Sequence, residues 1–78
     1  MQLQTTLDHL SIGESATILS LSFPAAKRRR MLDLGFLPGA KVTALLESPW
    51  HDPVAYGIAG AVVALRHEDA RLITITGK

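Results

Sequence analysis

The chain has no cysteine, few aromatic residues and no long hydrophobic run. Without cysteine, neither disulfides nor a thiolate zinc site can replace a hydrophobic core, so stability must come from side-chain packing. Aromatic residues make up 5% of the chain and the formal net charge is only +1, so the composition does not indicate a nucleic-acid-binding surface. The longest uncharged stretch, residues 53–65, contains proline and glycine and falls short of the roughly 20 apolar residues of a membrane helix.

What is present is the composition of one small globular domain. The 78 residues are 47% hydrophobic and 19% charged, and a chain of this size buries about 60% of its unfolded surface when it folds. No repeat, low-complexity tract or linker divides it, so we predict a single domain over residues 1–78. The first ten residues lack the basic start and apolar run of a secretory signal, and we expect a cytoplasmic protein.

Residues 24–34 give the one strong helix signal. Pro24 suits the first turn of a helix, and the alanine, lysine, arginine, methionine and leucine that follow are strong helix formers. Gly35 stands where a left-handed residue ends many helices. In that ending, called a Schellman motif, Phe36 would contact Met31 across the turn.

Five short segments have the pattern of β-strands. They are residues 16–22, 41–47, 54–58, 62–66 and 72–76. In the second segment, strict alternation predicts that Val42, Ala44 and Leu46 share one face. In the first segment, apolar residues fall on both faces, which predicts burial on two sides. Strands this short cannot bury an open sheet, so we predict a small, partly closed barrel.

Two further segments are too short to be independent elements. Near the start, Leu3, Leu7 and Leu10 have roughly helical spacing, and we expect an N-terminal cap over the core that ends at Gly13. Near the end, residues 67–70 are polar and allow one helical turn at most. The expected fold is therefore mainly β, with about five strands and one full helix after the first strand.

Three stretches of the chain resemble one protein family. They read RRRMLDLGFLPGAKV, DPVAYGIAG and VVALRHEDARLITI. From about Leu10 to Ile75 the chain carries, in order, Gly13, Leu34-Gly35, Pro38-Gly39, Asp52-Pro53, Gly60 and Ala64-Leu65-Arg66. Six such elements in order resemble the FeoA family of small cytoplasmic partners in bacterial ferrous iron uptake.

The resemblance implies an SH3-like β-barrel of about five strands with one α-helix inserted after the first strand. It also implies a partner, the FeoB-type ferrous iron permease with its cytoplasmic G domain, and a place at the inner face of the membrane through that partner. The same barrel recurs as the C-terminal domain of DtxR-like metal-dependent repressors, so the fold alone does not fix the function. The chain departs from the family pattern at His51, where glycine usually precedes Asp-Pro, and at residues 27–30, which are unusually basic.

The candidate site is a docking surface at the end of the predicted helix. Residues 27–30 hold four of the eight basic residues, and they form either a docking patch for an acidic or phosphate-bearing surface or a solvated face. The turn that follows places apolar side chains beside them, and arginine with aromatic anchors is favoured at protein contacts. The predicted partner-binding residues are Arg29, Arg30, Leu34, Gly35, Phe36, Leu37, Pro38 and Gly39.

The loop at residues 48–53 carries the remaining candidates. Trp50 is expected to cover the barrel end or, if exposed, to anchor an interface. His51 and Asp52 could supply one nitrogen and one oxygen to a metal, as could residues 67–69, but adjacent loop side chains rarely converge on one ion. We therefore expect no cofactor and no tight iron site, and leave weak or transient divalent metal binding open.

Two functions stay open at this point. One is a non-enzymatic accessory protein that docks on a FeoB-type permease and modulates it, because no nucleophile, phosphate loop or carboxylate pair indicates catalysis. The other is a stand-alone SH3-like module, metal-responsive or associated with nucleic acid, related to repressor C-terminal domains. The chain has no helix-turn-helix segment for reading DNA, which favours the first.

Overall fold

Six β-strands and two α-helices follow one another along residues 4–77, the part of the chain that this computed structural model describes. In chain order the elements are β1 (Gln4–Thr6), the 3-10 helix η1 (Leu7–His9), β2 (Ser15–Leu21), α1 (Ala25–Asp33), β3 (Lys41–Glu47), β4 (Val54–Ile58), β5 (Ala61–Leu65), α2 (His67–Ala70) and β6 (Ile73–Thr76). The predicted mainly β fold with one full helix is confirmed.

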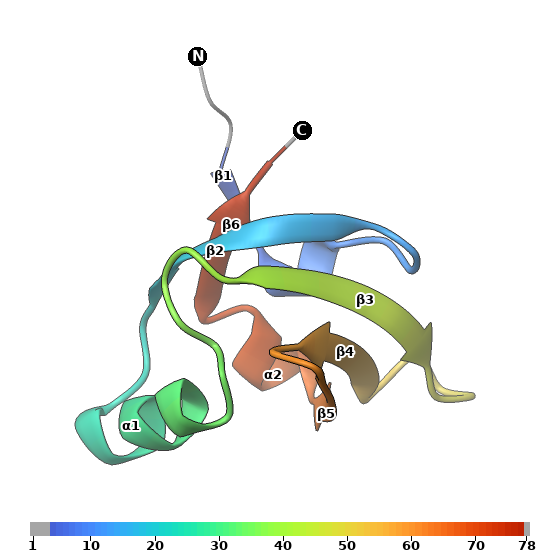
Figure 1. Ribbon diagram of the computed structural model, residues 1–78. Helices are drawn as coiled ribbons and strands as arrows, with labels where there is room; N and C mark the ends of the chain where they lie inside the picture. The colour runs from blue at the N-terminus through green and yellow to red at the C-terminus, as the bar shows by residue number, and fades with distance from the viewer. Residues whose placement is uncertain (1–3, 78) are drawn as a thin grey trace.

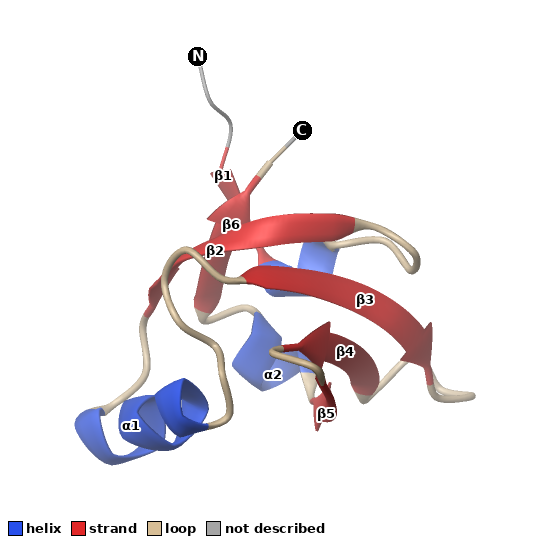
Figure 2. Ribbon diagram, in the orientation of Figure 1, coloured by secondary structure: helices blue, strands red, loops and turns tan. Residues whose placement is uncertain are grey.

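The strands form one antiparallel sheet in the order β1-β6-β2-β3-β4-β5. The sheet curls around the core, and α1 lies to one side of it, below the long β2 and β3 arches (Figure 1, Figure 2). Strands β1 and β5 are its two edges and do not pair with each other, so the sheet is not closed by hydrogen bonds. The one-turn helices η1 and α2 lie against each other beside this opening.

The N-terminus corrects two predictions. Residues 4–6 of the expected N-terminal cap form β1, whose Gln4 and Thr5 pair with Thr76 and Ile75 of β6. Residues 7–9 form the one-turn helix η1, which does pack against the core. Strand β1 is too short and polar to be recognised alone, because its conformation comes from the partner strand. The described residues therefore contain six strands, and the helix follows the second. Leu7 is fully buried in η1, whereas Leu3 lies outside the described residues.

Irregular pairing corrects the predicted faces of β2 and β3. The register of β3 against β4 shifts between Ala44 and Leu46, so Val42 and Ala44 are buried while Leu46 is 61% exposed. A one-residue shift moves every later side chain to the opposite face. In β2 the shift between Ile18 and Ser20 lets both Ile18 and Leu21 enter one core. Two-sided burial of this strand is therefore wrong.

Helix α1 ends as predicted. The Gly35 N–H donates to the Leu32 carbonyl at 3.0 Å, and the Phe36 N–H donates to the Met31 carbonyl at 3.1 Å. Gly35 has φ +110°, the left-handed conformation that glycine adopts freely. This is the hydrogen-bond pattern of a Schellman motif, and the buried side chains of Phe36 and Met31 accompany it.

Candidate docking surface

Helix α1 presents its basic run to solvent. Lys27, Arg28, Arg29 and Arg30 are all exposed. The Lys27 Nζ lies 2.8 Å from Asp69 Oδ1 in α2, which compensates that charge. Within residues 4–77 none of the three arginines forms an ion pair. The helix therefore carries three arginines without an ion-pair partner, and its net charge stays positive because Asp33 is its one acidic residue.

The turn of the helix separates these arginines. Successive residues rotate by about 100° around the axis of an α-helix. Met31 is buried, and Arg30 and Leu34 line a groove beside it. Arg29 precedes Met31 by two positions, about 200° of rotation, and faces away from the core. Of the two arginines predicted to act together, Arg30 alone borders the groove.

The turn after α1 exposes less apolar surface than its sequence indicates. Leu34 is 39% exposed and Leu37 is 49% exposed, so both remain candidates for contact with a partner. Phe36 has no exposed surface. The Schellman motif reverses the chain at Gly35 and places Phe36 against the core beside Met31. Phe36 is thus a core residue, which corrects its assignment to the docking surface.

The remaining residues of the predicted site shape the turn. Gly39 has φ +92°, and its N–H donates to the Ile18 carbonyl at 2.7 Å, which joins the turn to β2. A Cβ at Gly35 would lie 2.9 Å from the Cβ of Ala59 in the β4–β5 turn. Pro38 and Gly39 are exposed, and a role of Gly35, Pro38 and Gly39 in partner binding stays a prediction.

A groove of about 410 Å³ separates α1 from β5. It is lined by Lys27, Arg30, Met31 and Leu34 on the helix, Val63, Ala64 and Leu65 on the strand, and Asp69 in α2. The strand wall was missed in the sequence, where residues 62–66 were predicted only as a strand. Its signal is composition: β5 reads AVVAL, without the polar alternation of a strand that has one solvated face.

The two candidate metal ligands do not converge. The His51 Nδ1 lies 2.8 Å from Glu47 Oε1, whereas Asp52 Oδ1 accepts the His67 N–H at 2.9 Å and so binds the first turn of α2. His51 has φ 66°, so the position where the family usually has glycine does adopt a left-handed conformation. Among residues 4–77 no three histidine or acidic side chains are grouped as a metal site.

Trp50 does not cover the barrel end. Its side chain is 86% exposed in the β3–β4 loop. The register of β3, β4 and β5 also places Leu46 and Val62 on the outer face of the sheet, where they are 61% and 68% exposed. The expected cover of the barrel end is therefore wrong, and a role of Trp50 as an interface anchor stays a prediction.

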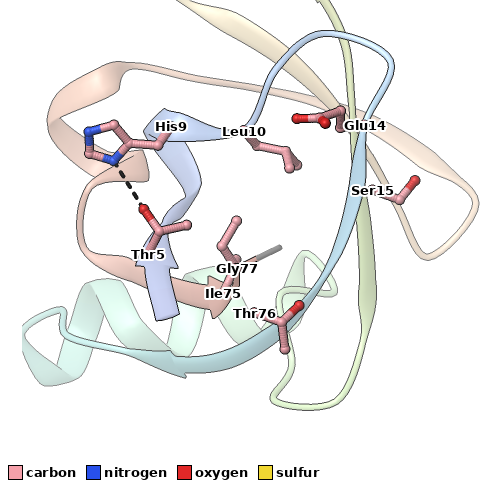
Figure 3. Close-up of a pocket in the computed structure, with 8 residues that line it drawn as sticks. All are labelled: Thr5, His9, Leu10, Glu14, Ser15, Ile75, Thr76 and Gly77. Atoms are coloured by element: carbon pink, nitrogen blue, oxygen red, sulfur yellow. Dashed lines mark hydrogen bonds between the residues drawn. The ribbon is translucent and has the colours of Figure 1, made fainter. Parts of the chain in front are cut away.

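A second hollow, of about 280 Å³, lies where β1, β2 and β6 meet (Figure 3). His9 and Glu14 lie on opposite sides of Leu10 at its rim. The His9 Nδ1 is 3.4 Å from Thr5 Oγ1, and Glu14 accepts the Ser11 N–H at 3.2 Å. Both polar groups are thus engaged with neighbours in the chain rather than directed at a common point.

The fold and the exposed groove define a small β domain with a candidate binding surface. No helix within the described residues is long and apolar enough to cross a membrane. The model of the FeoA family, described as the FeoA domain, matches residues 5–76. The chain belongs to the FeoA family, as its sequence motifs predicted.

A curated relative links the family to Fe(2+) transport. The Fe(2+) transport protein A/Fe(2+) transporter FeoB fusion protein of Porphyromonas gingivalis is 36% identical to this chain over 69 residues. The match covers 88% of this chain and 8% of that protein. The chain therefore corresponds to a small part of a much longer relative.

Solved structures confirm the SH3-like fold. The FeoA protein of Chlorobium tepidum superposes with a TM-score of 0.87 at 33% identity, covering 92% of this chain and 69% of that chain. FeoA of Stenotrophomonas maltophilia, complexed with zinc and described as a prokaryotic SH3 domain protein, has a TM-score of 0.78 at 27% identity, covering 91% and 88%. A manganese-dependent transcriptional repressor has a TM-score of 0.84 at 16% identity, covering 100% of this chain and 44% of that chain, and shows the shared fold alone.

Proposed function

We propose that this chain is a non-enzymatic accessory protein of bacterial ferrous iron uptake, which docks on the cytoplasmic part of a FeoB-type permease and modulates it. The observation that carries the proposal is the fusion in the P. gingivalis relative, whose name joins transport protein A to FeoB in one chain. A covalent link raises the effective concentration of two domains to about the millimolar range, which favours domains that act together. A separate chain needs a binding surface to reach the same association.

The end of α1 offers such a surface. Leu34 is partly exposed and lines the groove together with Arg30, which has no ion-pair partner, and Leu37 is partly exposed in the turn that follows the helix. An apolar centre with a charged rim is the usual anatomy of a protein interface. The apolar side chains then supply affinity, while the arginine supplies steering toward an acidic partner surface.

The test is calorimetric titration of the full chain with the cytoplasmic part of the FeoB-type permease from the same cell. We expect Leu37→Ser to weaken binding by about fivefold or more. The matched control is Ile12→Ser, because Ile12 is 45% exposed and Leu37 is 49% exposed. The two lie in loops at opposite ends of the β2–β3 pair (Figure 1). Circular dichroism verifies that both variants fold.

Two results would count against this proposal. Folded wild-type chain that gives no heat of binding would contradict docking itself. Equal affinities of the Leu37→Ser and Ile12→Ser variants would contradict the surface that we assign to it.

A further inference from the structure

Strand β5 is an open edge of the sheet. It pairs only with β4, which it follows through a two-residue turn at 59–60. In an antiparallel ladder closed by such a turn, alternate residue pairs exchange hydrogen bonds. Val63 therefore bonds with Tyr56, whereas the backbone groups of Val62 and Ala64 point away from β4. No backbone partner in the described chain meets them on that side.

The sequence of this edge lacks the residues that usually discourage pairing. Exposed edge strands commonly carry lysine, proline or a bulge, which discourage another strand from adding to them. β5 contains neither charge nor proline, and its register with β4 is regular along all five residues. An apolar, regular edge is a template for an extended chain.

Helix α1 lies alongside this edge, so that β5 and α1 form the two walls of the groove. The first turn of α1 contacts α2 through the ion pair of Lys27 and Asp69, and Gly35, just after the C-terminus of α1, approaches Ala59 before β5. α1 thus runs antiparallel to β5, with about 13 Å of helix beside about 17 Å of strand. The groove between them has apolar side chains on both walls, with Met31 and Leu34 beside the charged Lys27 and Arg30 on the helix side.

The charge on this wall selects the occupant. Arg30 lines the groove and forms no ion pair within residues 4–77. Arg28 and Arg29 add positive charge on the same helix, which outweighs the single negative charge of Asp33. Asp69, which also lines the groove, is already paired with Lys27. An incoming segment is therefore favoured when it carries carboxylates next to apolar side chains.

We propose that the groove between α1 and β5 binds an extended acidic segment of the permease's cytoplasmic part, which adds to β5 as a further strand. The backbone of the segment pairs with Val62 and Ala64. Its apolar side chains pack against Leu34 and Val63, and a carboxylate pairs with Arg30. The inference rests on the proposed function and specifies how the docking occurs.

Amide hydrogen exchange tests strand addition directly. The isotope-labelled full chain is compared with and without a saturating amount of the unlabelled cytoplasmic part of the permease. We expect the exchange rates of the Val62 and Ala64 amides to fall by about tenfold or more in the complex. The amide of Val63 is the internal control, because β4 already protects it in the free chain.

Two pairs of variants test separately how the helix wall and the strand wall of the groove contribute to binding. Arg30→Glu should weaken binding by about fivefold or more and flatten its salt dependence. Arg29→Glu makes the same charge change outside the groove and should have a smaller effect. Ala64→Pro removes the outward N–H and should weaken binding, whereas Ala64→Val keeps it and should not. If Ala64→Pro fails to fold, the amide hydrogen exchange of the wild-type chain still tests whether a strand adds to β5.

Each outcome has one meaning. Binding without protection of Val62 and Ala64 overturns strand addition and leaves the proposed function intact. Absence of binding by folded wild-type chain overturns both. Protection that appears in the free chain as its concentration rises means that β5 pairs with a second copy, which also overturns the assigned occupant.

Discussion

Gly35 shows how one residue fixes the geometry of the candidate surface. It ends α1 in a left-handed conformation and brings the turn within contact of Ala59. Any side chain at this position meets two costs, a strained backbone and a collision with the β4–β5 turn. The end of α1 and the start of β5 are therefore held together where the groove closes.

Replacing Gly35 separates these two costs. We expect Gly35→Ala to lower the free energy of unfolding by about 2 kcal/mol or more, of which about 1 kcal/mol is backbone strain. Gly39→Ala is the matched control, since Gly39 also has a positive φ but has open space around it. Chemical denaturation measures both, and equal losses would show that the approach of Gly35 to Ala59 is not tight.

The ionisation of Tyr56 makes the stability of the fold depend on pH in the alkaline range. Burial, with smaller contributions from the charges of Asp8 and Asp52, raises the pKa of Tyr56 from 10.0 to about 12. The hydroxyl donates a long hydrogen bond of 3.4 Å to the Leu7 carbonyl. Because the folded pKa exceeds the unfolded one, the folded state keeps the proton longer. The contribution of the protonated Tyr56 to the free energy of unfolding is complete below pH 10 and is lost as the pH rises toward 12.

The expected loss between these pH values is on the order of 2 kcal/mol. Denaturation of wild type and Tyr56→Phe across this range measures it, because the variant retains every other titrating group. The chain has one tyrosine, so ultraviolet absorbance also reports the phenolate directly. If the free energy of unfolding of the two proteins depended on pH in the same way, the raised pKa of Tyr56 would be contradicted.

At the scale of elements, local patterns were reliable only where pairing was regular. The strand predicted at residues 54–58 is confirmed as β4, and its alternating Val54, Tyr56 and Ile58 are all buried. The helix and its ending were also predictable, because proline and glycine act through local backbone geometry. The faces of Leu46 and Leu21 were not, since register shifts depend on the partner strand and leave no local signal.

Parts of the candidate site also depend on tertiary packing and strand order, which local sequence patterns do not show. The basic run and the exposed Leu34 and Leu37 could be predicted from the sequence, but the burial of Phe36 depends on how the turn packs on the core. The open edge of β5 is a property of strand order rather than of any residue. Sequence reasoning therefore identified the helix side of the groove and not its strand side.

The register shift in β3 has a direct test. We expect Leu46→Thr to change the free energy of unfolding by less than about 0.5 kcal/mol, as for other exposed positions. Val42→Thr, which places a hydroxyl in the core, should cost about 1–3 kcal/mol. Val42 is fully buried and Leu46 is 61% exposed. Similar large losses at both positions, measured by urea denaturation, would mean that the strand alternates without a shift.

At the scale of the whole molecule, the groups that could bind iron are dispersed. His51 and Asp52 have different partners within the chain, and His9 lies in the hollow beside β1. We predict that the isolated chain has no stoichiometric ferrous iron site of submicromolar affinity. Anaerobic calorimetry tests this, and a tight site lost in His51→Ala would contradict it.

Ferrous iron uptake in cells that lack this gene tests whether the chain acts in iron uptake by docking through the end of α1. We expect wild type and the Ile12→Ser variant to restore uptake, whereas Leu37→Ser and Arg30→Glu, expressed at equal levels, restore it only weakly. Full restoration by both docking variants would rule out docking through this surface, and unchanged uptake when the chain is absent would rule out a role in iron uptake.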